Sequence, residues 1–205
     1  MLTAGQIEER LQLGYEARGL ELKGPGPRSD KHLLAKVARA ALSLGNLRDG
    51  GHVIIGIDDA DPGELGPGLA SGDLASWIAY DDLARTLANY ADPPLRFNVA
   101  AIELSTGAMV AVIEVFEFAD IPHFCAKERE GVLRDGALYV RPRKVPETSE
   151  VASPIEMREI IELATEKALR AYVETAERAG VTLAPGPRPP SSDELYEAEE
   201  GQAWE

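Results

Sequence analysis

Residues 45–59 read Gly45-Asn46-Leu47-Arg48-Asp49-Gly50-Gly51-His52-Val53-Ile54-Ile55-Gly56-Ile57-Asp58-Asp59. The apolar run in this stretch begins after a pair of glycines and ends in a pair of aspartates. A continuous apolar run of this length is typical of a strand that is buried on both faces. The sequence therefore predicts a central strand that places carboxylates at its C-terminal end.

A strand and a helix are predicted before this central strand. Residues 20–23 alternate apolar and polar side chains, which in a strand places Glu21 and Lys23 on one face. Ser29 and Asp30 offer an N-cap for a helix that carries apolar residues at helical spacing. The order strand, helix, strand favours a right-handed crossover and therefore parallel pairing of the two strands.

The whole chain is predicted to adopt an α+β fold, a mixed β-sheet with flanking helices followed by a long C-terminal helix. We expect residues 1–150 to form the main domain, 151–180 to form a helix that packs on it or extends from it, and 181–205 to be a disordered acidic tail. The other expected elements are a helix within the first fifteen residues, a surface loop over 60–80, a helix over 83–90, and strands over about 95–104, 108–116 and 138–141.

Composition limits the classes of function. The formal net charge of −14 argues against a simple electrostatic nucleic-acid binder, because such proteins neutralise phosphates with Lys and Arg. The positive residues nevertheless form two groups, which are either a binding surface or ordinary solvated faces. One group is Arg28, Lys31, Lys36, Arg39 and Arg48, and the other is Lys127, Arg129, Arg134, Arg141, Arg143 and Lys144.

The sequence also gives expectations for the cellular location of the protein and for its disulfide and zinc chemistry. The sequence shows neither a membrane-spanning apolar run nor a secretory leader, which favours a cytoplasmic location. The single cysteine, Cys125, rules out an internal disulfide framework, and with three histidines in the chain a structural zinc site is not expected.

The order of these motifs resembles that of the Schlafen/Alba-like nucleic-acid-binding domain, which is found in many bacterial regulators and defence proteins. The resemblance covers about residues 14–145, and the glycine-pair strand is its most specific part. Residues 43–49 carry a small insertion relative to the compact turn of that family. The matching pieces are Glu16, Glu21-Leu22-Lys23, the helix that ends near Gly45-Asn46, residues 50–59, and Gly136-Ala137-Leu138-Tyr139-Val140-Arg141.

This resemblance implies a protein that binds RNA or DNA. In some relatives it implies a metal-dependent endoribonuclease that cuts structured RNA such as tRNA. Carried over by position, the catalytic and metal-binding carboxylates are Glu16, Glu21 and Asp59, with Asp58 as an alternative to Asp59. Mg²⁺ or Mn²⁺ suits such oxygen ligands and would activate water there. Strand alternation allows only one of the two aspartates to face Glu21.

Basic and aromatic residues are candidates for contact with the nucleic acid. Lys23 would neutralise a phosphate oxygen, and Tyr139 and Arg141 would stack on a base and hold a phosphate. The alternatives are that Glu21 and Lys23 form only an ion pair, and that Tyr139 is a half-buried residue beside a solvated arginine. The full candidate set is Lys23, Arg28, Lys31, Arg48, Tyr139, Arg141, Arg143 and Lys144.

A second hypothesis is a non-catalytic protein-interaction or regulatory module. Its C-terminal helix, which begins at Ser153-Pro154 and ends before Gly180, would mediate a homo-oligomer or bind a protein partner. That helix has more apolar residues than one narrow stripe requires, among them Ile155, Ile160, Ile161, Leu163, Leu169, Tyr172 and Val173.

Overall fold

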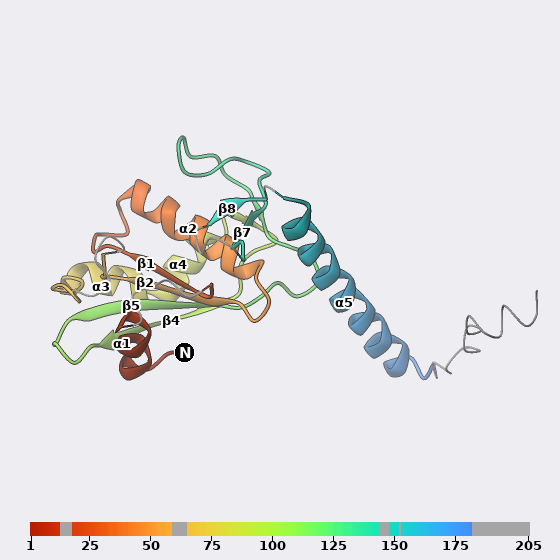
Figure 1. Ribbon diagram of the computed structural model, residues 1–205, viewed down its shortest axis with the longest axis horizontal. Coiled ribbons are helices and arrows are strands. Elements are labelled where there is room, and N and C mark those ends of the chain that lie inside the picture. Colours follow the sequence, from red (N-terminus) through yellow and green to blue (C-terminus); the bar gives the residue numbers. More distant parts are fainter. Residues whose placement is uncertain (13–17, 59–64, 144–147, 152, 182–205) are drawn as a thin grey trace, which may run out of the picture. The chain divides into compact units, whose positions relative to one another are not determined.

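The computed structural model in Figure 1 describes residues 1–12, 18–58, 65–143, 148–151 and 153–181. Contacts divide the chain into two units, Met1–Lys167 and Ala168–Glu205. The expected acidic tail at 181–205 lies outside the described residues except for Val181. Among the described helices, none combines the length and apolar character needed to cross a bilayer.

The first unit is built on a four-stranded mixed sheet, with strands in the order β1-β2-β5-β4. The parallel pairing of β1 with β2 places Glu21 beside Val53 and confirms the predicted crossover, whereas the other two pairings are antiparallel. The two strands predicted over about 95–104 and 108–116 are also confirmed, and they pair with each other as an antiparallel hairpin. The four strands are β1 (Leu20–Lys23), β2 (Gly51–Ile55), β4 (Phe97–Glu103) and β5 (Met109–Val115).

Helices and short strands complete an α+β fold. The predicted cap of α2 is present, because the Asp30 side chain accepts hydrogen bonds from the N–H groups of His32 and Leu33. The helices are α1 (Ala4–Gln12), α2 (Lys31–Gly45), α3 (Ser71–Ile78), α4 (Tyr80–Leu87) and α5 (Pro154–Arg178). The short strands are β3 (Ala91–Asp92), β6 (Phe124–Cys125), β7 (Tyr139–Val140) and β8 (Ser149–Glu150).

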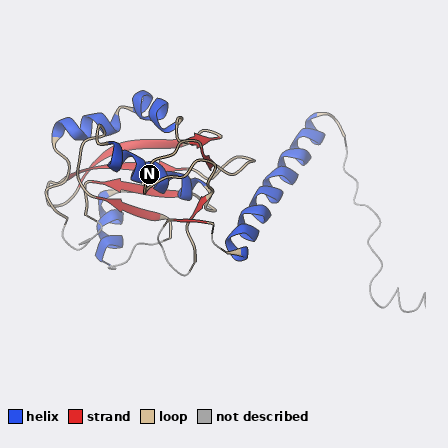
Figure 2. Ribbon diagram, turned by 90° about the horizontal axis from the view of Figure 1, so that it is seen from above, coloured by secondary structure: helices blue, strands red, loops and turns tan. Residues whose placement is uncertain are grey.

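The central strand β2 is buried on both faces, as its apolar run predicts. Val53 and Ile55 belong to the apolar cluster that contains the buried residues of α2, and Ile54 belongs to the cluster that contains Ile7 and Leu11 of α1. Figure 2 shows the strands with helices packed around them. Alternate side chains of one strand therefore join two separate parts of the core.

The turn before β2 needs its glycine pair. Asp49 and Gly50 both have positive φ angles, 68° and 69°. A Cβ on Gly50 would collide with the carbonyl oxygen of Val115, and a Cβ on Gly51 would lie 2.6 Å from the carbonyl oxygen of Gly19. The glycines therefore allow close backbone approach on both sides of β2.

The prediction of a surface loop over residues 60–80 was wrong for its second half, because Ser71–Ile78 forms α3. Trp77 is fully buried, and its indole Nε1 donates a hydrogen bond of 2.9 Å to the carbonyl oxygen of Gly26. Leu74 and Ile78 pack against the same core at helical spacing. Tertiary burial of this apolar face outweighs a local composition rich in Gly, Asp and Ser.

Candidate functional site

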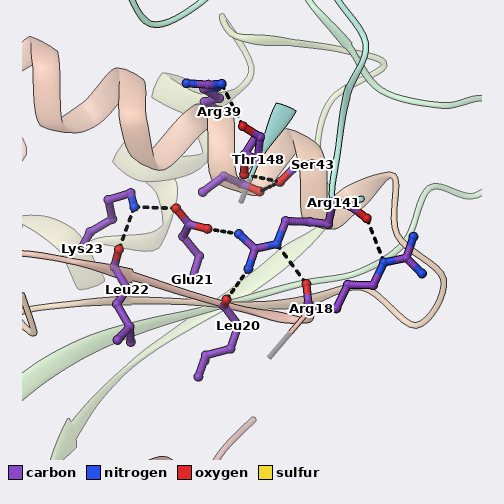
Figure 3. Close-up of polar contacts among 10 residues, drawn as sticks. Arg18, Leu20, Glu21, Leu22, Lys23, Arg39, Ser43, Arg141 and Thr148 are labelled. Carbon is purple, nitrogen blue, oxygen red and sulfur yellow. Dashed lines mark hydrogen bonds and ion pairs between the residues drawn. The ribbon is translucent and has the colours of Figure 1, made fainter. Parts of the chain in front are cut away.

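Glu21 lies at the centre of a buried group of charges (Figure 3). The side chain of Lys23 is on the same face of β1, and its Nζ lies 2.5 Å from Oε1 of Glu21 and 2.7 Å from the carbonyl oxygen of Leu22. Nη1 of Arg141 donates to Oε2 of Glu21. Glu21, Lys23 and Arg141 are exposed by only 8%, 8% and 1%. The two oxygens of the carboxylate therefore each face one cation.

Arg141 also closes the edge of the sheet. β1 is the outermost strand, and Arg141 donates from Nη2 to the carbonyl oxygen of Leu20 at 2.5 Å and from Nε to that of Arg18 at 3.0 Å. Arg18 reciprocates, because its Nε donates to the carbonyl oxygen of Arg141 at 2.8 Å. A side chain from a distant segment thus donates hydrogen bonds to carbonyl oxygens at this edge of the sheet, which would otherwise be open to pairing with another strand.

The predicted metal site is only partly described. Glu16 and Asp59 lie outside the described residues. The strand β2 ends at Ile55, before the predicted aspartates, and Asp58 is exposed three residues beyond that end. Within the described ranges, no three His, Cys, Asp or Glu side chains converge in a way that could hold a metal ion. For Glu21 to bind Mg²⁺ or Mn²⁺, the metal would have to replace Lys23 or Arg141 at a carboxylate oxygen. In the conformation described, the surroundings of Glu21 suit an ion pair rather than a divalent cation.

The predicted nucleic-acid contacts fall into two groups. Lys31, Arg48 and Arg143 are exposed and Arg28 is half-buried, whereas Lys144 lies outside the described residues. The other three, Lys23, Tyr139 and Arg141, are buried.

Tyr139 has a structural role in the protein interior. Its hydroxyl accepts a hydrogen bond of 2.9 Å from the backbone N–H of Arg134, and the guanidinium of Arg39 lies 5.4 Å from its ring centre. Burial raises the pKa of the Tyr139 hydroxyl. The sequence predicted a strand over residues 138–141, but it did not reveal that Tyr139 and Arg141 are both buried.

Four arginines meet at one cavity of about 170 Å³, and we call it the arginine cavity. Arg18, Arg48, Arg141 and Arg143 come from the segment before β1, the turn before β2 and the segment after β7. Asn46 supports this region, because its Nδ2 donates to the carbonyl oxygens of His123 and Tyr139 at 2.8 and 3.0 Å. Arg18 was not among the candidates from the sequence, since nothing local to it indicates this position.

Glu156, Glu159 and Glu162 of α5 line the other part of the cavity, and Glu166 lies about one turn beyond Glu162, outside that lining. Glu159 accepts from Nη2 of Arg18 at 2.8 Å and lies 2.5 Å from Nε of Arg143, and Glu166 accepts from Nη2 of Arg48 at 2.8 Å. Burial acts to raise the pKa of Glu159, but the hydrogen bond and charge of Arg18 and the charge of Arg143 outweigh it, so the pKa lies below its ordinary value. Sequence analysis did not single out these glutamates.

Comparisons with known proteins identify no family. Neither a protein-family model nor a curated protein matches the sequence. A solved structure similar to this chain is that of the DIP2311 protein from Corynebacterium diphtheriae, with a TM-score of 0.45 and 18% sequence identity. The match covers 72% of this chain and 26% of that protein, so this chain spans about a quarter of its length. A similarity of this extent carries no argument about function.

The buried charges predict strong energetic coupling between Glu21 and Arg141. Arg141→Met and Glu21→Gln are each expected to lower the free energy of unfolding by about 3 kcal/mol or more. Glu21→Gln leaves two buried cations without their counter-charge, and Arg141→Met removes the donor to one Glu21 oxygen and to two backbone carbonyl oxygens. The double variant should lose less than the sum of the two, by roughly 1–3 kcal/mol. Urea denaturation followed by circular dichroism measures all three.

The control is the exposed pair of Arg85 and Asp82, with a separation of 2.9 Å and an exposed side-chain fraction of 77% for Arg85. Arg85→Ala should change the free energy of unfolding by no more than about 1 kcal/mol. Strict additivity of the Glu21 and Arg141 substitutions would contradict the coupling.

Proposed function

We propose that this chain is a nucleic-acid-binding domain of the Schlafen type that contacts phosphates of RNA or DNA through the arginine cavity. The observation that carries the proposal is the convergence of Arg18, Arg48, Arg141 and Arg143 from separate segments of the chain. The order of sequence motifs over residues 14–145 supports the same class of function. Arginine suits this role, because its planar guanidinium can donate two parallel hydrogen bonds to a phosphate.

Two of these arginines are accessible to a ligand. The side chain of Arg48 is 57% exposed and that of Arg143 is 72% exposed, whereas Arg141 is fully buried and supports the wall of the cavity. The net charge of −14 opposes long-range attraction of a polyanion. Binding therefore depends on a local surface and is expected to be strongest at low salt.

A more specific version of this proposal is metal-dependent cleavage of structured RNA. It requires Glu16, Glu21 and Asp59 to converge on Mg²⁺ or Mn²⁺, which would supply an activated water and stabilise the charge of the transition state. Glu21 binds two side-chain cations in the conformation described. Binding without cleavage is therefore the function that the geometry supports better.

Removal of either exposed arginine should weaken binding of nucleic acid. Arg48→Ala and Arg143→Ala are each expected to lower the affinity for a labelled tRNA and a labelled single-stranded DNA, because each removes a phosphate contact. For the single strand, the slope of log K against log salt should fall by about 0.7. Fluorescence anisotropy over a range of salt concentrations measures both effects.

Arg85→Ala removes the same charge from α4 and is the matched control, with an expected affinity equal to that of the unmodified protein. Equal losses of affinity in all three variants, or no binding by any of them and by the unmodified protein, would contradict the proposal.

Cleavage is tested separately. The same tRNA is incubated with Mg²⁺ or Mn²⁺ and either the unmodified protein, Glu21→Gln or Asp59→Asn. Metal-dependent cleavage that both substitutions abolish would establish the nuclease form.

A second candidate function is self-association through α5. One observation favours it: large apolar side chains of this helix are exposed, with values of 61% for Leu169, 64% for Tyr172 and 39% for Val173. They lie within one turn of each other, so they form a continuous apolar strip on the helix. A strip of this kind is typical of a contact between two helices.

Self-association predicts a dimer of the 22.1 kDa chain. Light scattering coupled to size exclusion should give twice that mass, and Leu169→Glu/Tyr172→Glu should give a monomer, because charges would be buried in the contact. Glu174→Gln/Glu177→Gln in the same helix is the control and should remain dimeric. A monomer at all concentrations would eliminate this candidate.

A further inference from the structure

The acidic face of α5 resembles a short run of phosphates in its spacing. Glu159, Glu162 and Glu166 follow one another at three and four residues, which places their side chains on one face of the helix. Glu159 and Glu166 are separated by about 10.5 Å along the helix axis, at about 1.5 Å per residue. This length corresponds to about three nucleotides of one strand of B-DNA.

The contacts of this face are those that a bound polyanion would make. Glu159 bridges two guanidinium groups, those of Arg18 and Arg143, and Glu166 binds that of Arg48. Three of the four arginines of the cavity are thus held by carboxylates of α5, and Arg141 is held by Glu21. The cavity lies entirely within the first unit, so the helix segment that lines it belongs to the same compact body.

We propose that the first half of α5, with Glu159 and Glu166, is an intramolecular mimic of a phosphate backbone. It covers the arginines of the cavity until a nucleic acid displaces it, and we call it the mask. This inference rests on the proposed function. Glu159 and Glu166 compete with phosphates for Arg18, Arg48 and Arg143. The mask controls access to the same site and adds a regulatory step to binding.

The outer ion pair between α5 and the arginine cavity is weak enough for a nucleic acid to displace it. The pair of Arg48 and Glu166 has exposed side-chain fractions of 57% and 42%, and exposed ion pairs contribute no more than about 1 kcal/mol. Ile160 and Leu163 are buried and hold the helix on the unit, as does Lys167, whose Nζ lies 2.5 Å from Oε1 of Glu117. The acidic face is thus presented by a packed helix, while its outer ion pair is individually weak.

Neutralising the mask should tighten binding. Glu159→Gln/Glu166→Gln is expected to lower the Kd for a labelled single-stranded RNA of about 20 nucleotides by about tenfold or more, because the arginines no longer have charged competitors. Fluorescence anisotropy at one fixed salt concentration compares this double variant with the unmodified protein. Glu166→Gln alone neutralises the exposed pair with Arg48 and should lower the Kd by a smaller factor, about threefold. This single variant takes the place of the double variant in the test if the double variant fails to fold.

Glu174→Gln/Glu177→Gln is the matched control. It removes two negative charges from the same helix about two turns beyond Glu166, away from the ion pairs of Glu159 and Glu166 with Arg18, Arg143 and Arg48. Its Kd should stay within about twofold of that of the unmodified protein. Equal tightening in both double variants would assign the effect to net charge and overturn the mask. Binding by all proteins with unchanged Kd would overturn the mask but leave the proposed function. No binding by any protein would overturn both.

Discussion

The hydrogen bonds between the guanidinium of Arg141 and the edge strand β1 are the contacts on which the rest of the described site depends. Arg141 follows β7, and it joins that segment to a strand 120 residues earlier by pairing with Glu21 and donating to the carbonyl oxygens of Arg18 and Leu20. A neutral residue could neither balance the Glu21 carboxylate nor supply so many donors in one plane. The contact therefore neutralises a buried charge and closes a sheet edge at the same time.

The position of the arginine cavity follows from this link. Because Arg18 and Arg141 each donate to the backbone of the other, the segments before β1 and after β7 run past each other at a fixed separation. That arrangement brings Arg18 and Arg143 within reach of the same carboxylate, Glu159. The buried ion pair thus has a structural role, and the exposed arginines beside it are the groups that can exchange partners.

The local parts of the fold could be predicted from sequence, because their signals are local. The apolar run of β2, the Asp30 cap of α2 and the same-face placement of Glu21 and Lys23 all depend on neighbouring residues. The burial of that face could not be predicted, since its cover comes from Arg141. The same limit applies to Glu159, whose arginine partners are remote in sequence, and to α3, whose helix depends on the burial of Trp77.

The surroundings of Glu21 determine how a metal could act at this site. Lys23 and Arg141 together supply two positive charges to one carboxylate, the same total charge as Mg²⁺ or Mn²⁺. Charge balance alone would permit an exchange. The donors of Arg141 are also committed to two backbone carbonyl oxygens, however, so its departure would break hydrogen bonds in a buried region and leave those oxygens without this donor. Among the contacts described, displacement of Lys23 breaks a hydrogen bond to one backbone carbonyl oxygen, that of Leu22, instead of two. A metal that reached Glu21 would therefore replace Lys23 rather than Arg141.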